Sequence, residues 1–328
     1  MTERVRLSDG LRIELATGET VVADAEQPDG DINVLSHAHG DHLYREAPSK
    51  LVCSETTAAL TRTRRDESEY GELNRTTDPA VDLVNAGHVA GSRAVRVEGD
   101  ERTYLYTGDC SPRDRCYLDG LDPVPADVLV IEATYGTPAY VFPEQDELER
   151  RIVEWLNDTL DRPVLLFGYA LGRAQKLQRL VARSDRPRLF VSEAIADLNA
   201  AIETHLDVGF GATEYDSLAP EPGDAVVLPM GSARLDFVDR LVEERDAVTA
   251  GFSGWAVEDS FRYRGGYDEA FVLSDHADFE ELRAVVDAVD PDQVYTQHGF
   301  ADEFARELTS HGYDAQALKE DQTSLGQF

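Results

Sequence analysis

Three histidines and an aspartate lie within the six residues 37–42, which read H-x-H-x-D-H, although the chain of 328 residues has only eight histidines. The segment directly follows the predicted strand 31–36. Imidazole and carboxylate groups are the ligands that zinc-class metals prefer. In an extended loop, residues i and i+2 point to the same side, so His37 and His39 can bind one ion. Asp41 and His42 lie just beyond, where we expect the loop to enter a helix, and can reach a second ion.

Further metal ligands are expected at the ends of other predicted strands. His88 lies between glycines in "NAGHVAGS", Asp109 ends "YTGD", and His298 follows the strand in "YTQHG". Taken singly, each is more often a structural residue than a ligand, but all three follow apolar runs. A carboxylate can bridge two cations, and Asp109 is the candidate for that position. The sequence therefore predicts a two-metal site.

The elements that must position these residues alternate in type along the chain. Strands that form a meander are predicted over 83–109, and the apolar run in "ADVLVIEATYG", residues 126–136, has the length of a strand that is buried on both faces. A helix is predicted over 144–158, and strand–helix units follow it. This alternation predicts an α/β fold, in which the block of about 143–262 is a doubly wound insert within a larger domain.

The chain is extremely acidic, with 64 acidic and 31 basic residues and a net charge of −33. Its acids are spread along the whole sequence, and the many Val, Leu and Ile runs exclude a disordered acidic segment. Only three of the basic residues are lysines. This composition resembles that of a cytoplasmic protein from an extreme halophile, in which concentrated salt screens the self-repulsion. An anionic substrate is therefore not excluded, but local cations must hold it.

The same composition indicates a cytoplasmic location. There is no run of 18 apolar residues that could span a membrane, and the first ten residues contain no apolar signal-peptide core. The three cysteines form no CxxC motif, which suits a reducing compartment better than a disulfide framework.

Together these motifs resemble the metallo-β-lactamase superfamily, whose ligand motifs occur here in the same order. Within it, Glu132 in "VLVIEATYG", His276 in "VLSDHAD" and His298 in "TQHG" resemble motifs A, B and C of the β-CASP nucleases. The segment "ALGRAQKLQRL" is similar to their "GRAQE" element, but Lys176 stands where Glu is usual. The resemblance runs from about residue 10 to 325. It extends to a short bacterial and archaeal branch described as ligase-associated DNA exonucleases or mRNA 3′-end processing factors.

The resemblance implies an αββα metallo-β-lactamase sandwich with a compact inserted β-CASP α/β domain. We expect its first part over 1–142, the insert over 143–262 and its last part over 263–328. The resemblance also implies two Zn²⁺ ions. It assigns one to His37, His39, His88 and Asp109, and the other to Asp41, His42, Asp109 and His298.

The activity that the resemblance implies is hydrolysis of phosphodiester bonds by water that the two metals activate. His276 has the right pKa class to protonate the leaving oxygen as general acid. Glu132 is expected to orient His276 and keep it protonated, and Asp41 is expected to belong to the catalytic set.

Three arginines are candidates for substrate binding. Arg173 begins a predicted helix after Gly172, where a phosphate can meet both a guanidinium and backbone N–H groups. The alternative interpretation of Arg173 is that it belongs to an ordinary helix start. Arg262 and Arg264 flank Tyr263 in "FRYRGG", a mixture that suits single-stranded nucleic acid. A solvated β-edge is the alternative interpretation there.

We expect a zinc-dependent nuclease that acts on single-stranded nucleic acid. In the larger relatives, His at motif C accompanies RNA enzymes, so His298 favours RNA. The likeness to ligase-associated exonucleases favours DNA, as an exonuclease of a repair system. A small-molecule ester or thioester hydrolase would not need the insert, and a non-catalytic scaffold would not keep every ligand. Whether the cleavage is endo- or exonucleolytic, its polarity and the oligomeric state stay open.

Overall fold

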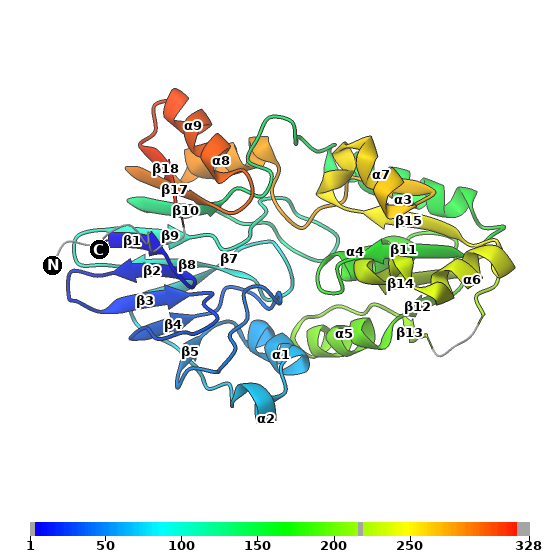
Figure 1. Cartoon of the computed structure of the whole chain (residues 1–328), viewed down its shortest axis with the longest axis horizontal. Helices are drawn as coiled ribbons and strands as arrows, with labels where there is room; N and C mark the ends of the chain where they lie inside the picture. The colour runs from blue at the N-terminus through cyan, green and yellow to red at the C-terminus, as the bar shows by residue number, and fades with distance from the viewer. Residues whose placement is uncertain (1–3, 216–218, 320–328) are drawn as a thin grey trace, which may run out of the picture. The chain divides into compact units, whose positions relative to one another are not determined.

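The computed structural model describes residues 4–215 and 219–319, which fold as two compact units (Figure 1). The first unit comprises Met1–Pro112, Gly120–Ala139 and Phe279–Phe328. The second comprises Arg113–Asp119 and Tyr140–Asp278, and the expected insert of 143–262 lies within it. Each unit is described by itself.

The first unit contains two six-stranded sheets. One has the order β1–β2–β3–β4–β5–β6, with strands β1 (Arg4–Leu7), β2 (Leu11–Glu14), β3 (Thr20–Ala23), β4 (Ile32–Val34), β5 (Leu51–Val52) and β6 (Arg75–Thr76). The other has the order β18–β17–β10–β9–β8–β7, with strands β7 (Val81–Asn85), β8 (Arg93–Glu98), β9 (Thr103–Tyr106), β10 (Val128–Glu132), β17 (Gln293–Gln297) and β18 (Ala315–Ala317).

The two sheets pack face to face because alternate residues of their strands are apolar. Val21 and Ala23 of β3 share one buried cluster with Val128 and Val130 of β10. The helices of this unit are α1 (Glu55–Arg64), α2 (Glu67–Tyr70), α8 (Phe279–Val289) and α9 (Ala301–Ser310). Helices α8 and α9 lie on the side of the second sheet that faces away from the first (Figure 1). The predicted sandwich is confirmed.

Parallel pairing brings three strand ends to one edge of the second sheet. Strand β10 pairs in parallel with both β9 and β17, with Val130 opposite Tyr106 and Glu132 opposite Gln297. The segments that follow these strands therefore begin side by side. They carry Asp109 after β9 and His298 after β17, and Glu132 is the last residue of β10.

The second unit is a parallel sheet with helices on both faces. Its order is β13–β12–β14–β11–β15–β16, with strands β11 (Val164–Gly168), β12 (Leu189–Val191), β13 (Thr213–Glu214), β14 (Ala225–Pro229), β15 (Val248–Phe252) and β16 (Glu269–Phe271). Its helices are α3 (Gln145–Asp158), α4 (Arg173–Val181), α5 (Glu193–His205), η1 (Met230–Arg234), α6 (Asp236–Arg245), η2 (Gly254–Val257) and α7 (Asp259–Gly265).

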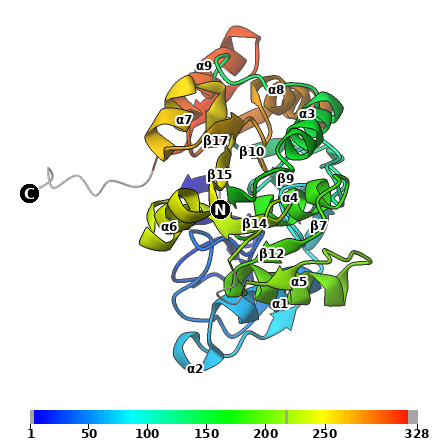
Figure 2. The ribbon, with the colours of Figure 1, turned by 90° about the vertical axis from the view of Figure 1, so that its right-hand side faces the viewer.

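Residues of β11 show why helices cover both faces of this sheet. Val164 and Leu166 pack with α3, α4 and α5, whereas Leu165 and Phe167 pack with α6 and α7. Figure 2 shows these two sets of helices on opposite sides of the strands. A strand that is buried on both faces is continuously apolar, as "PVLLFG" is. The doubly wound α/β arrangement expected of the insert is present.

One local expectation was wrong. Gly40, Asp41 and His42 form a turn and no helix follows them, since the chain continues irregularly to β5. The alternative of a solvated β-edge at Arg262 and Arg264 is excluded, because both residues lie in α7. None of the helices in the described part of the chain is long and apolar enough to cross a membrane.

Candidate metal centre

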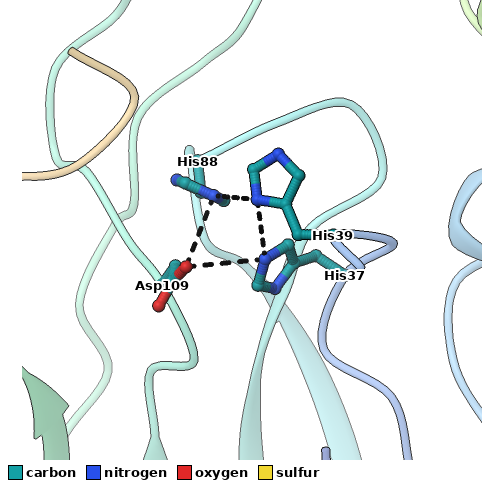
Figure 3. A group of neighbouring side chains, drawn as sticks. All are labelled: His37, His39, His88 and Asp109. Carbon is teal, nitrogen blue, oxygen red and sulfur yellow. Dashed lines mark hydrogen bonds and ion pairs between the residues drawn. The ribbon is translucent and has the colours of Figure 1, made fainter. Parts of the chain in front are cut away.

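Four predicted ligands converge in the first unit from three different strand ends. His37 and His39 follow β4, His88 follows β7 and Asp109 follows β9. Nδ1 of His39 lies 3.1 Å from Nε2 of His37 and 3.0 Å from Nε2 of His88. Oδ2 of Asp109 lies 3.5 Å and 3.6 Å from the same two Nε2 atoms. Figure 3 shows the three rings and the carboxylate around a common point.

These distances fit one tetrahedral metal ion. Four donors at zinc-like bond lengths are separated from one another by about 3.3 Å. The four donor–donor distances given above range from 3.0 to 3.6 Å, and all the donor atoms lie within 4.8 Å of one another. Three imidazoles and one carboxylate are also the donor types that a zinc-class ion takes. The set His37, His39, His88 and Asp109 therefore fits the ion that the sequence assigns to it.

A second layer of contacts fixes the orientation of His37. The Ser36 hydroxyl donates to Oδ2 of Asp24 at 2.5 Å and lies 3.0 Å from Nδ1 of His37. Since its hydrogen is used towards Asp24, this hydroxyl accepts a hydrogen from Nδ1 of His37. Nε2 of His37 then carries the lone pair, and it is this atom that faces the other donors.

His42 is oriented by the same carboxylate. Its Nδ1 lies 3.0 Å from Oδ2 of Asp24, while its Nε2 faces Oδ2 of Asp109 at 3.5 Å. Tyr106 donates to Oδ2 of Asp24 at 2.8 Å, and the Ser36 backbone N–H donates to Oδ1. Burial lowers the pKa of His42, but Asp109 and Asp24 outweigh burial and raise it well above its usual value.

The remaining predicted ligands are less closely gathered. Asp41 and His298 are exposed, and they line one cavity of about 840 Å³ together with His42, Asp24 and Tyr106. The rings of His42 and His298 lie 6.0 Å apart. Among the described residues, neither Asp41 nor His298 belongs to a group of three metal-binding side chains within 4.8 Å of one another. Of the second predicted ligand set, His42 and Asp109 face each other at 3.5 Å.

Two glycines allow the ligand segments to approach each other. Gly108 precedes Asp109 and has φ +55°, and a Cβ there would lie 2.8 Å from Oγ of Ser36. Gly87 precedes His88 and has φ +68°, and a Cβ there would lie 2.1 Å from the carbonyl oxygen of Ser111. Any other side chain would be strained at both positions and would displace a ligand segment.

Glu132 is buried at the end of β10, beside the segment that carries Asp109. Its Oε1 accepts the backbone N–H of Cys110 at 2.8 Å, and its Oε2 accepts that of Thr134 at 3.3 Å. These two bonds fix the carboxylate plane and compensate part of the cost of burying the charge.

His276 belongs to the second unit and lies three residues before Phe279, where the chain enters the first unit. It is half-buried, and its backbone N–H donates to Oγ of Ser274. The preceding residue, Asp275, is fully buried and forms ion pairs with Arg173 and Lys176 of α4.

The structure places the three candidate substrate arginines differently from one another. Arg173 was expected to meet a phosphate, but its side chain is 1% exposed and its guanidinium lies 2.9 Å from Oδ2 of Asp275. Its charge is therefore used inside the second unit, and we withdraw that expectation. Arg262 and Arg264 lie exposed on α7.

Sequence reasoning missed Asp24, Ser36 and Tyr106, which support the ligands without belonging to the motif. Asp24 follows β3 and adopts φ +54°. Its nearness to the histidines depends on the parallel pairing of β3 with β4. A polar residue directly after an apolar strand was the available signal, but the same pattern occurs at many surface turns.

No family model matches the chain. It is 35% identical over 303 residues to a "Probable DNA ligase" of Opitutus terrae, which covers 89% of this chain and 29% of that protein. It is 30% identical over 210 residues to an "RNase J-like protein" of Methanocaldococcus jannaschii, which covers 54% of this chain and 48% of that protein. The match thus spans less than a third of the length of the first relative and about half of the length of the second.

Among the solved structures with the same fold is one that matches nearly the full length of the chain. It is described as a protein of unknown function from Enterococcus faecalis and superimposes with a TM-score of 0.66. The match covers 97% of this chain and 96% of that chain, at 14% sequence identity. At this identity the likeness concerns the fold alone.

Proposed function

Because the chain belongs to the β-CASP family of the metallo-β-lactamase superfamily, we propose that it is a metal-dependent nuclease that hydrolyses phosphodiester bonds of nucleic acid. The observation that carries this proposal is the convergence of His37, His39, His88 and Asp109 at metal-ligand spacing. A small-molecule hydrolase could use the same donors, but it has no need for a second unit of this size. A non-catalytic scaffold has no need for the donors.

We propose that zinc occupies this centre, with His37, His39, His88 and Asp109 holding one ion. His42 and Asp109, joined by Asp41 and His298, would hold a second ion. When bound, the metals supply Lewis-acid chemistry, which lowers the pKa of a water and neutralises charge on the phosphate. Asp24 and Ser36 hold the imidazoles in the tautomer that metal binding requires.

We propose His276 as the general acid that protonates the leaving oxygen. The positions of Glu132 and His276 in the sequence match motifs A and B of the family, and Glu132 is proposed to orient the imidazole and favour its protonated form. The buried pairs of Asp275 support this role because they fix the backbone on one side of His276.

We propose single-stranded RNA as the first candidate substrate. The relative named RNase J-like protein supports this choice, and so does His298 at motif C. DNA is the second candidate, because the relative that covers 89% of this chain is named a probable DNA ligase. The chain matches only 29% of that protein, so the name describes a longer protein of which this chain corresponds to one part.

The test is a cleavage assay in about molar KCl with zinc, with end-labelled single-stranded RNA and DNA of identical sequence side by side. Wild type, His276→Ala and His37→Ala would be compared. His311→Ala is the matched control, because His311 is exposed at the C-terminal end of α9 and belongs to none of the motifs. The proposal expects cleavage by wild type and the control, and a loss of at least about a hundredfold in His276→Ala.

Each outcome decides between the candidates. RNA cleavage supports an RNA-processing enzyme, and cleavage of DNA alone supports a repair exonuclease. If zinc binds with the expected stoichiometry and neither nucleic acid is cut, the nuclease proposal is wrong. Ester and thioester substrates should then be tested.

A further inference from the structure

A separate cavity of about 560 Å³ lies on the second unit, where η1, η2 and α7 meet. Its lining includes Arg234, Trp255, Phe261, Arg264 and Tyr267. We refer to it as the Arg234 pocket. Its volume lies in the range of pockets that hold small ligands. None of the predicted metal ligands lines it.

Aromatic rings form its apolar wall. The rings of Phe261 and Tyr267 are tilted by 34° to each other, with 5.7 Å between their centroids, and Tyr267 is buried. Trp255 is 38% exposed, and its ring meets that of Tyr140 edge-on at 5.1 Å. The Tyr140 hydroxyl is in turn bonded to Glu258 at 2.6 Å. Trp255 is therefore held in place while part of its ring stays open to solvent.

Positive charge gathers at the same place, in a chain with a net charge of −33. Arg234 of η1 donates to the backbone carbonyl of Arg264 at 2.9 Å, and Arg264 donates to Oγ of Ser260 at 3.0 Å. Arg262 lies on the same helix. Within residues 4–215 and 219–319, none of these three arginines forms an ion pair with an acid.

A structural role alone does not account for this arrangement. Cations in the last turn complement the negative end of a helix, which accounts for Arg262 and Arg264. Arg234 also donates to the Arg264 carbonyl at this helix end, but neither role accounts for the exposed face of Trp255 in the same pocket as Arg234 and Arg264. The acid in the pocket, Glu258, already accepts hydrogen bonds from Tyr140 and Ser260.

An open aromatic face beside guanidinium groups that form no ion pair with a described acid matches the chemistry of a nucleotide, although Arg264 also acts electrostatically on Glu258. Bases stack on aromatic rings regardless of sequence, and one guanidinium group can donate hydrogen bonds to two oxygens of the same phosphate. We propose that the Arg234 pocket binds one nucleotide of a single-stranded nucleic acid, with the base on Trp255 and the phosphate at Arg234 and Arg264. The inference rests on the proposed nuclease function, to which it adds a second point of contact with the strand.

Fluorescence of Trp255 tests the proposal directly, since the chain has only two tryptophans. In the full chain with Trp155→Phe, binding of a ten-nucleotide single strand in a chelating buffer should quench the remaining emission. Arg234→Gln with Arg264→Gln should weaken this binding about tenfold, and Trp255→Leu should weaken it similarly. Arg240→Gln with Arg245→Gln, both exposed on α6, is the matched control and should bind as wild type.

Kinetics separate this inference from the proposed function. In the variant that combines Arg234→Gln with Arg264→Gln, KM for the oligonucleotide should rise about tenfold. The rate at which this variant hydrolyses bis(p-nitrophenyl) phosphate should stay unchanged. If the variant binds and cleaves the oligonucleotide as wild type does, the pocket proposal is wrong and the nuclease proposal stands. A different result would support the pocket and overturn the nuclease proposal. In that case wild type cleaves no substrate, the single strand still quenches Trp255 emission, and the Arg234→Gln and Arg264→Gln substitutions weaken this binding.

Discussion

Nζ of Lys176 lies 2.6 Å from Oδ1 of Asp275, and both side chains are fully buried in the second unit. Arg173 pairs with the other oxygen of the same carboxylate, and Arg115 donates to the backbone carbonyl of Asp275. Lys176 is the residue at which the "GRAQ" element departs from the family pattern. Here it joins α4 to the residue that precedes the proposed general acid.

Removing the carboxylate should cost far more stability than removing the ammonium group. Asp275→Asn leaves Arg173 and Lys176 buried without their counter-charge, and we expect a loss of about 3–5 kcal/mol in the free energy of unfolding. Lys176→Met leaves Arg173 as the partner of Asp275, so its loss should be smaller. Urea denaturation of both variants measures this, and equal losses would contradict the asymmetry.

Lys176 should also give the stability a distinct pH dependence. Burial lowers the pKa of Lys176 from 10.5 to about 8. Between these values the unfolded chain holds a proton that the folded chain has lost, so this contribution to stability rises with pH. Between pH 8 and pH 10.5, the free energy of unfolding of wild type should rise by at most about 3 kcal/mol relative to that of Lys176→Met. Lys50→Met, on the surface, is the matched control, and a flat difference for Lys176→Met would refute the prediction.

The sequence was informative wherever the signal is local. The spacing of His37, His39 and His42 predicts metal ligands by itself, and apolar runs such as the one in "ADVLVIEATYG" predict buried strands. In both cases the property depends on residues that are close together in the chain. The pairing of Lys176 with Asp275 spans 99 residues and leaves no local pattern.

The same reasoning explains where sequence interpretation failed. Arg173 follows a glycine at a helix start, which is the local pattern of a phosphate site, but the packing of α4 turns its side chain towards Asp275. Asp24 is one of 64 acids, and only the pairing of β3 with β4 places it beside Ser36. Tertiary contacts decide both cases.

Asp24→Asn should weaken metal binding. Asp24 accepts four hydrogen bonds, from the Ser36 N–H and hydroxyl, from Tyr106 and from His42. An amide offers only one acceptor oxygen, so whichever way it turns, its NH2 group faces donors. We expect zinc affinity to fall by about 10–100-fold, measured by competition with a chelator. Asp29→Asn, at an exposed side chain, is the control, and unchanged affinity in Asp24→Asn would rule out this supporting role.

Gly108→Ala should distort the centre through Ser36. The left-handed backbone at φ +55° disfavours alanine, and the new Cβ would lie 2.8 Å from Oγ and 2.9 Å from Cβ of Ser36. We expect a loss of about 2 kcal/mol or more in stability, together with weaker zinc binding. Thermal unfolding with and without zinc measures both effects. Gly209→Ala, whose Cβ would meet no atom within 4 Å, should leave both unchanged.

The net charge of −33 should make folding depend on salt, and we propose that the chain is adapted to high salt. The Debye length falls from about 10 Å at 0.1 M to about 3 Å at 1 M, which screens repulsion among dispersed acids. Exposed ion pairs such as Arg150–Glu154 are weakened by the same salt, but each contributes less than about 1 kcal/mol. The free energy of unfolding should therefore rise between 0.1 and 2 M KCl. Sucrose at equal osmolality separates charge screening from general solute exclusion. A stability that is flat or falling in KCl would mean that repulsion among the acids does not govern how the fold responds to salt.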